Sequence, residues 1–167
     1  MNRHALVMPL KDSVLHLAAE HLAAQLPRLH AAIRDMEVVE QSFATASIAF
    51  DGERIHVGRT PDGATPGKGP LASEGDLEYA LAIVAEMIAM EAVERVGGRD
   101  ARTWNSACMM VAVANLRMSG VFATPVYCAP FDIPMYDGMK PSSLYDRLIE
   151  LDKAPRQMVG IMTLDDL

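Results

Sequence analysis

The feature that most constrains this chain is a pair of consecutive apolar helices, predicted at residues 76–96 and 104–119. Both ranges consist mainly of alanine, leucine, isoleucine, valine and methionine. On a helical wheel at about 100° per residue, Glu86 and Glu94 share one arc, and that arc is itself interrupted by apolar residues. A helix with so little polar surface must be covered on most sides, so the pair is predicted to form the centre of the fold.

The ends of these helices are also marked. Ser73 and Asp76 have the spacing of a capping box, with aspartate in place of glutamate. Gly97 is the residue expected in the left-handed conformation after the first helix, and Asp100 or Thr103 is the expected N-cap of the second. Neither helix is predicted to cross a membrane, because the first apolar run is cut by glutamate and a span needs about 20 apolar residues.

A β-hairpin is predicted at residues 46–57. Two runs rich in β-branched and aromatic residues flank Asp51-Gly52, the pair preferred in a type I′ turn. A two-residue turn at that point pairs Phe50 with Glu53. One face of the hairpin is then predicted to meet the core and the other to meet water; the core face carries Ile48, Phe50, Ile55 and Val57.

The remaining elements follow from shorter patterns. In chain order they are an edge strand at 5–10, helices at 13–26 and 28–41, a flexible loop at 58–75, a strand at 121–128, a helix from Ser142 or Ser143 to Asp152, and a strand at 157–164. Strands lie on both sides of the central helices in sequence. The predicted fold class is therefore α+β: one domain, 1–167, with a small mixed or antiparallel sheet packed on the helical pair.

Composition limits the classes of function. The chain has 167 residues, of which 22% are charged, with a net charge of −7 and the acids dispersed. Such a charge argues against direct nucleic-acid binding and against anionic membrane surfaces. The two cysteines form no disulfide framework, and the apolar run at 5–10 is too short for a signal peptide, so a cytoplasmic protein is predicted. No residue spacing matches a metal site, and neither a metal nor a cofactor is expected.

The first functional hypothesis is a small acidic binding protein, acting as a regulator, inhibitor or adaptor, without enzymatic activity. Its contact surface is predicted in the loop 127–139, with homodimer formation as a variant. The loop combines apolar anchors and two charges with prolines, which reduce the entropy lost on docking. The alternative is a connection that packs its own aromatic side chains onto the helices. The candidate contact residues are Tyr127, Phe131, Asp132, Met135, Tyr136, Asp137 and Met139.

The second hypothesis is an enzyme or small-ligand-binding protein. Arg99, Arg102 and Thr103 stand at the predicted start of a helix, where free backbone N–H groups favour an anion. The reacting group in this hypothesis is Glu86 or Cys128. The simpler interpretations are that the arginines lie in solvent, that Glu86 belongs to a thin exposed stripe, and that Cys128 is a semi-buried thiol with no histidine, such as His56, beside it.

A third hypothesis is an acidic mimic of nucleic acid that inhibits a nucleic-acid-binding protein. It requires exposed carboxylates along one face.

The glycine-rich segment 63–69 resembles a phosphate-binding loop only superficially, because it lacks one residue of the required spacing and the hydroxyl that would follow the lysine.

Overall fold

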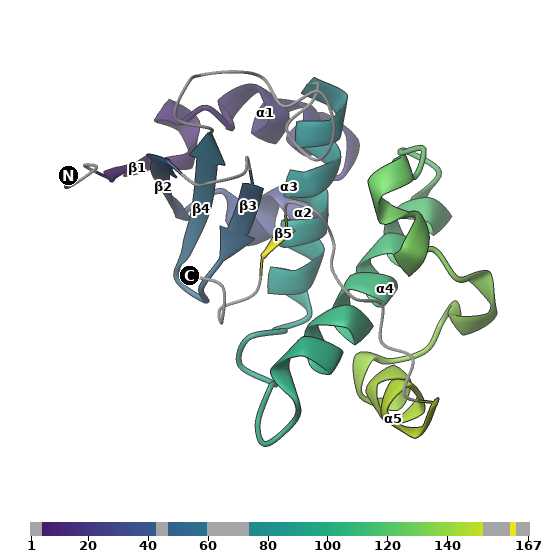
Figure 1. The fold of residues 1–167 in the computed structure, drawn as a ribbon. Coiled ribbons are helices and arrows are strands. Elements are labelled where there is room, and N and C mark those ends of the chain that lie inside the picture. The colour runs from purple at the N-terminus through teal and green to yellow at the C-terminus, as the bar shows by residue number, and fades with distance from the viewer. Residues whose placement is uncertain (1–4, 43–46, 60–73, 152–160, 163–167) are drawn as a thin grey trace.

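The structure is a computed structural model and describes residues 5–42, 47–59, 74–151 and 161–162 (Figure 1). The elements, with η for 3-10 helices, are β1 (Leu6–Pro9), η1 (Leu10–Asp12), α1 (His16–Gln25), α2 (Pro27–Ile33), β2 (Glu37–Ser42), β3 (Ser47–Phe50), β4 (Arg54–Arg59), α3 (Glu74–Ala89), α4 (Ala101–Ser119), η2 (Val126–Phe131), η3 (Pro134–Tyr136), α5 (Pro141–Leu151) and β5 (Ile161–Met162). Residues 60–73 of the predicted loop 58–75, which include Ser73, lie outside the described residues. Within that loop, residues 58 and 59 belong to β4, and 74 and 75 to α3.

The described strands form one mixed sheet in the order β1-β2-β4-β3-β5. β1 pairs with β2, and β3 with β4, in antiparallel fashion, whereas β2 with β4 and β3 with β5 are parallel. β1 lies at the edge of the sheet and ends at Pro9, as expected for a residue that cannot donate a ladder hydrogen bond. The α+β class and the mixed sheet are therefore confirmed.

The hairpin predicted at 46–57 is present as β3 and β4, but its turn is not type I′. Phe50 pairs with Ile55 and not with Glu53, which shifts the register by two residues. Gly52 and Glu53 become the central residues of the turn. Only Gly52 has a positive φ, of 100°, whereas a type I′ turn needs positive φ at both central positions.

Asp51 accounts for the shift. Its Oδ1 accepts hydrogen bonds from the backbone N–H groups of Glu53 and Arg54, both at 2.8 Å, which is the local capping typical of aspartate at turns. A two-residue shift preserves the alternation of faces, so the predicted core face is confirmed; it carries Ile48, Phe50, Ile55 and Val57, all buried. The opposite face was predicted to meet water, and this is wrong at Ala49, which is fully buried between β4 and β5.

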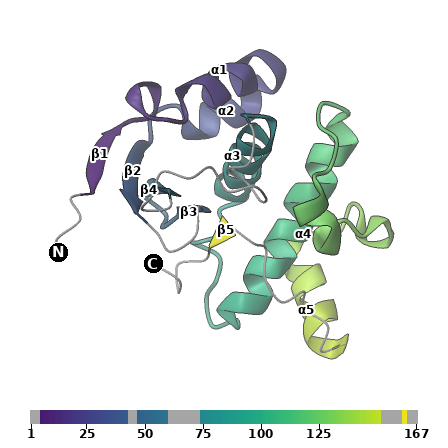
Figure 2. The ribbon, with the colours of Figure 1, turned by 45° about the horizontal axis from the view of Figure 1, so that its top comes forward.

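α3 is the central helix of the structure. It contacts β3 on one side, α1 and α2 along its length, and α4 on another side. Residues 80–85 are fully buried, as expected for a helix that is apolar on nearly every face. Figure 2 shows the resulting layers: the sheet, then α1 to α3, then α4 with α5. The two predicted helices pack against each other, and α3 stands between α4 and the sheet.

The first central helix is shorter than the predicted 76–96. The backbone N–H of Glu91 donates to the Ile88 carbonyl, and that of Ala92 donates to the Met87 carbonyl, both at 3.0 Å. Glu91 has φ of 55°. These bonds form a Schellman end, with glutamate at the left-handed position that glycine usually occupies. The apolar sequence continues beyond this point, which is why periodicity alone predicts a longer helix.

The turn that follows is fixed by its neighbours. The indole N–H of Trp104 donates to the carbonyl of Ala92 at 2.7 Å inside the core. Gly97 has φ of 55°, so its predicted left-handed conformation is confirmed, although it follows the turn and not α3 itself. Asp100 is the N-cap of α4, because its carboxylate accepts a hydrogen bond from the Thr103 N–H at 2.8 Å.

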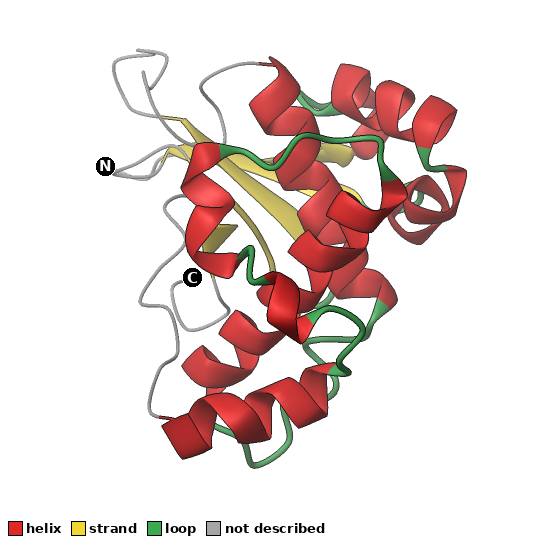
Figure 3. Cartoon of the chain, turned by 90° about the vertical axis from the view of Figure 1, so that its right-hand side faces the viewer, coloured by secondary structure: helices red, strands yellow, loops and turns green. Residues whose placement is uncertain are grey.

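Two other predicted elements are wrong in type. The helix predicted at 28–41 ends at Ile33, and its second half is the strand β2, whose adjacent valines are both buried between two neighbouring strands. The strand predicted at 121–128 is a loop followed by η2. Pro125 precedes this 3-10 helix and Pro130 lies inside it, and prolines cannot donate to a sheet ladder. Both η2 and α5 pack against α4, and Figure 3 shows this side of the molecule as helices and loops with the strands behind them.

Candidate interaction surface

Arg117, in the last turn of α4, binds two aspartates of the following loop. Its Nε donates to Asp132 Oδ1 at 2.8 Å, and its Nη2 donates to Asp137 Oδ1. The three side chains are about equally exposed, near one quarter to one third. The hydrogen bond to Asp137, followed by that to Asp132, raises the pKa of Arg117, so its charge is retained. We call these three residues the Arg117 clamp.

The Arg117 clamp fixes the segment 133–136 at both ends. Within the segment, the Tyr136 N–H donates to the Ile133 carbonyl at 3.0 Å, and the Asp137 N–H donates to the Pro134 carbonyl at 3.1 Å. The ring of Pro134 further restricts the backbone. This short 3-10 turn is therefore ordered before any partner arrives.

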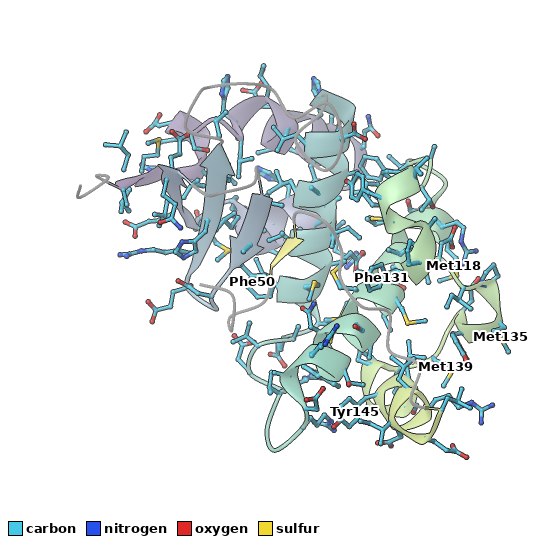
Figure 4. The ribbon with its side chains drawn as sticks, in the orientation of Figure 1. Phe50, Met118, Phe131, Met135, Met139 and Tyr145 are labelled. Carbon is cyan, nitrogen blue, oxygen red and sulfur yellow. The ribbon has the colours of Figure 1, made fainter. Side chains whose placement is uncertain are left out.

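The clamped segment holds an apolar side chain in solvent. Met135 is 76% exposed, and Met118, next to Arg117 on α4, is 56% exposed. Figure 4 shows both at the outer rim of the molecule, on the side formed by α4, η3 and α5. Tyr136, which follows Met135 in the chain, and Met139, whose N–H donates to the Tyr136 carbonyl at 3.1 Å, are half-buried. We call Met118, Met135, Tyr136 and Met139 the methionine surface.

The predicted contact residues fall into three groups. Met135, Tyr136 and Met139 belong to the methionine surface, and Asp132 and Asp137 are engaged by Arg117. Tyr127 is half-buried and donates from its hydroxyl to the Asp76 carbonyl on α3 at 3.2 Å. Phe131 is only 2% exposed and belongs to the core, so its predicted role as a surface anchor is a mistake. The alternative, a loop that packs its own aromatic rings inward, describes Phe131 and Tyr127.

Sequence reasoning missed Arg117 and Met118. Both lie in a helix that was interpreted as a buried apolar element. A usable signal was present: Arg117 is a single basic residue near the end of that helix, and two aspartates follow within 20 residues. Spacing along the chain could not show that all three meet, because that depends on how η2 turns the chain back along α4.

The predicted anion site at Arg99, Arg102 and Thr103 is largely engaged within the protein. The Thr103 N–H is already bound by Asp100, as described above. The Arg99 guanidinium lies 4.6 Å from the centre of the Trp104 ring, and its Nη1 donates to a backbone carbonyl of the preceding turn at 2.8 Å. Arg102 is exposed. Two of the three predicted groups, the Thr103 N–H and the Arg99 guanidinium, are therefore engaged within the protein.

Glu86 does not lie on an exposed stripe. It is 3% exposed, and each carboxylate oxygen has one donor. Arg28 Nη2 of α2 donates to Oε1 at 2.8 Å, and Asn115 Nδ2 of α4 donates to Oε2 at 3.1 Å. A buried carboxylate needs such partners, so Glu86 joins three helices through an otherwise apolar junction.

Cys128 and His56 do not form a catalytic pair. Cys128 is buried in η2, and burial raises the pKa of its thiol to about 12, so the nucleophilic thiolate is scarce. His56 lies on β4, where its Nε2 is 2.7 Å from Asp51 Oδ2. Burial alone would raise the pKa of Asp51, but the hydrogen bonds from His56 and from the backbone of the turn hold it below its ordinary value.

Comparison with known proteins gave no match: no family profile, curated protein or solved structure is similar to this chain. Among the described residues, no group of three or more histidine, cysteine, aspartate or glutamate side chains is placed to hold a metal ion. Within the same part of the chain, no helix combines the length and apolar character that crossing a bilayer requires.

Proposed function

We propose that this protein is a small binding protein that acts as a regulator, inhibitor or adaptor through the methionine surface. The observation that carries the proposal is the exposure of Met135 on a segment that the Arg117 clamp holds at both ends. Methionine adapts its shape to an apolar partner, and interface cores are enriched in methionine and tyrosine. A segment ordered in advance loses less entropy on binding than a free loop.

The proposed partner is another protein with apolar side chains, and a second copy of this chain is one such partner. Cytoplasmic location is part of the proposal, because Cys108 and Cys128 are buried thiols of the kind that persist in a reducing compartment. The binding site in this proposal is smaller than the predicted loop 127–139. It loses Tyr127, Phe131, Asp132 and Asp137, and it gains Met118.

Neither alternative function is favoured by a specific contact among the described residues. Of the groups expected to bind an anion at 97–103, the Thr103 N–H and Arg99 have internal partners, and Arg102 is exposed. Several carboxylates that a nucleic-acid mimic would display are paired with basic side chains: Asp51, Glu86, Asp132 and Asp137.

The test is affinity capture from a lysate of the native host, with mass spectrometry and size-exclusion chromatography. Wild type is compared with the double variant Met118→Glu, Met135→Glu. The control is Leu17→Glu, which places one carboxylate on α1, a helix that packs against α2 and α3, at a position that is 46% exposed. We expect one protein, or the second copy, to be retained by wild type and Leu17→Glu and lost by the double variant.

One result would contradict the proposed binding site. If all three proteins retain the same set of partners and elute at the same volume, the methionine surface is not the binding site. Thermal unfolding of each variant checks that the substitutions leave the fold unchanged.

A further inference from the structure

Of the methionines whose side chains the structure describes, Met8, Met36, Met90 and Met139 are half-buried, and the others form two groups that differ sharply in exposure. Met87, Met109 and Met110 are at most 3% exposed, whereas Met118 and Met135 are more than half exposed. The thioether of methionine is converted by peroxides to a sulfoxide, which is polar. A buried thioether reacts only when the structure opens locally, so the two groups of methionines differ in their access to peroxide.

The backbone around Met135 is held by contacts that do not involve its side chain. Arg117 binds on both sides of the segment, and the two backbone hydrogen bonds of η3 close the turn. Met118 precedes the end of α4, where the Gly120 N–H donates to the carbonyl of Arg117 at 3.1 Å. Oxidation of either thioether therefore changes the surface chemistry and removes no contact that holds the fold.

We propose that Met135 and Met118 form a reversible oxidation site for peroxides, and that their oxidation switches off binding at the methionine surface. The effect on binding rests on the proposed function, whereas the oxidation site itself does not. The thioether sulfur attacks one oxygen of hydrogen peroxide; the O–O bond breaks, an S–O bond forms, and water leaves. Sulfur loses two electrons and the peroxide gains them. A reductase that uses two thiols reverses the step, giving the thioether, a disulfide and water.

The first experiment maps the reaction in the intact protein. The chain is treated with hydrogen peroxide for increasing times, digested, and analysed by mass spectrometry. We expect Met135 and Met118 to convert at least about tenfold faster than the internal controls Met87, Met109 and Met110, because the buried residues react only through local opening. Circular dichroism and the melting temperature should remain unchanged once both exposed residues have reacted. Equal rates at all five positions, or loss of the fold, would overturn the proposal.

The second experiment measures the consequence for binding. The variant Met118→Leu, Met135→Leu keeps an apolar side chain of similar size and has no thioether at these positions. Each protein is compared with its own untreated sample: we expect peroxide to reduce the amount of protein that wild type captures from lysate, and to leave the amount captured by this variant at its own untreated level. Treatment of oxidised wild type with methionine sulfoxide reductase and dithiothreitol should restore capture.

The outcomes separate the switch from the proposed function. If oxidised wild type captures its partner as well as reduced wild type does, the switch is wrong, and the glutamate double variant still decides the binding site. If the leucine variant also loses its partner after peroxide, oxidation at another position is responsible and the assignment to Met118 and Met135 is overturned.

Discussion

Glycine at position 91 should stabilise this protein relative to alanine, which is the reverse of the usual order in helices. Glu91 lies just beyond α3 with φ of 55°, and its carboxylate pairs with Arg95, a contact in which both side chains are about 60% exposed. Replacing Glu91 with glycine or with alanine removes this pair in both cases. The comparison of Glu91→Gly with Glu91→Ala therefore isolates the backbone conformation.

The magnitude follows from the two possible conformations. In a helix interior, glycine is about 1 kcal/mol less favourable than alanine. In the left-handed conformation, a residue with a Cβ costs roughly 1–2 kcal/mol, from which about 0.5–1 kcal/mol is subtracted for the greater entropy of glycine in the unfolded chain. The expected result is that Glu91→Gly is more stable than Glu91→Ala by about 0.5–1 kcal/mol.

Urea unfolding followed by circular dichroism measures this difference. With a dependence of about 2 kcal/mol per molar urea, the midpoint of Glu91→Gly should lie roughly 0.25–0.5 M above that of Glu91→Ala. Thermal unfolding should give the same order, with a shift of about 1–4 °C for a protein of this size. If Glu91→Ala is the more stable by about 1 kcal/mol, residue 91 is helical, and the Schellman end of α3 is refuted.

Three further predictions concern single groups. Asp51→Asn should lower the stability of the protein at pH values above 3.8, the ordinary pKa of the carboxyl. This difference from wild type should shrink as pH falls through the lowered pKa of Asp51 in the folded state, because protonation removes the same interaction. Unfolding curves from pH 2 to 7 measure the difference, and a difference that grows toward low pH would contradict the prediction. Burial raises the pKa of both Cys108 and Cys128 to about 12. Neither thiol should therefore react with a thiol reagent at pH 8 until urea is added. Rapid labelling of the folded protein would show that the thiols are accessible. Trp104→Phe should cost about 1–3 kcal/mol in urea unfolding, because the buried Ala92 carbonyl loses its donor, and an unchanged midpoint would show that this hydrogen bond does not contribute.

The general architecture was predictable because it rests on strong local patterns. The apolar stretch around 76–119 predicts buried helices, and the alternation in 46–57 predicts a hairpin with Ile48 and Ile55 on the core face. Both predictions are confirmed. The details that were predicted wrongly, the hairpin register and the end of α3, are decided by single side chains. Asp51 shifted the pairing register of the hairpin by two residues through its own hydrogen bonds, and Glu91 ended α3 in a conformation that its residue type disfavours.

The candidate site was only partly predictable, for a different reason. The loop 127–139 was identified by its composition, but composition cannot distinguish Phe131, which is buried, from Met135, which is exposed. That distinction depends on tertiary contacts made by a residue outside the loop. Arg117 engages Asp132 and Asp137, which local sequence suggested as charges for a partner.

The most direct test of the proposed binding site is the single variant Met135→Glu in the lysate capture, quantified by mass spectrometry against wild type and Leu17→Glu. Burying a new carboxylate in an apolar contact is unfavourable, so we expect Met135→Glu to recover at most about one tenth of the partner recovered by the other two proteins. Equal recovery by all three proteins would contradict the central claim that Met135 is presented for binding.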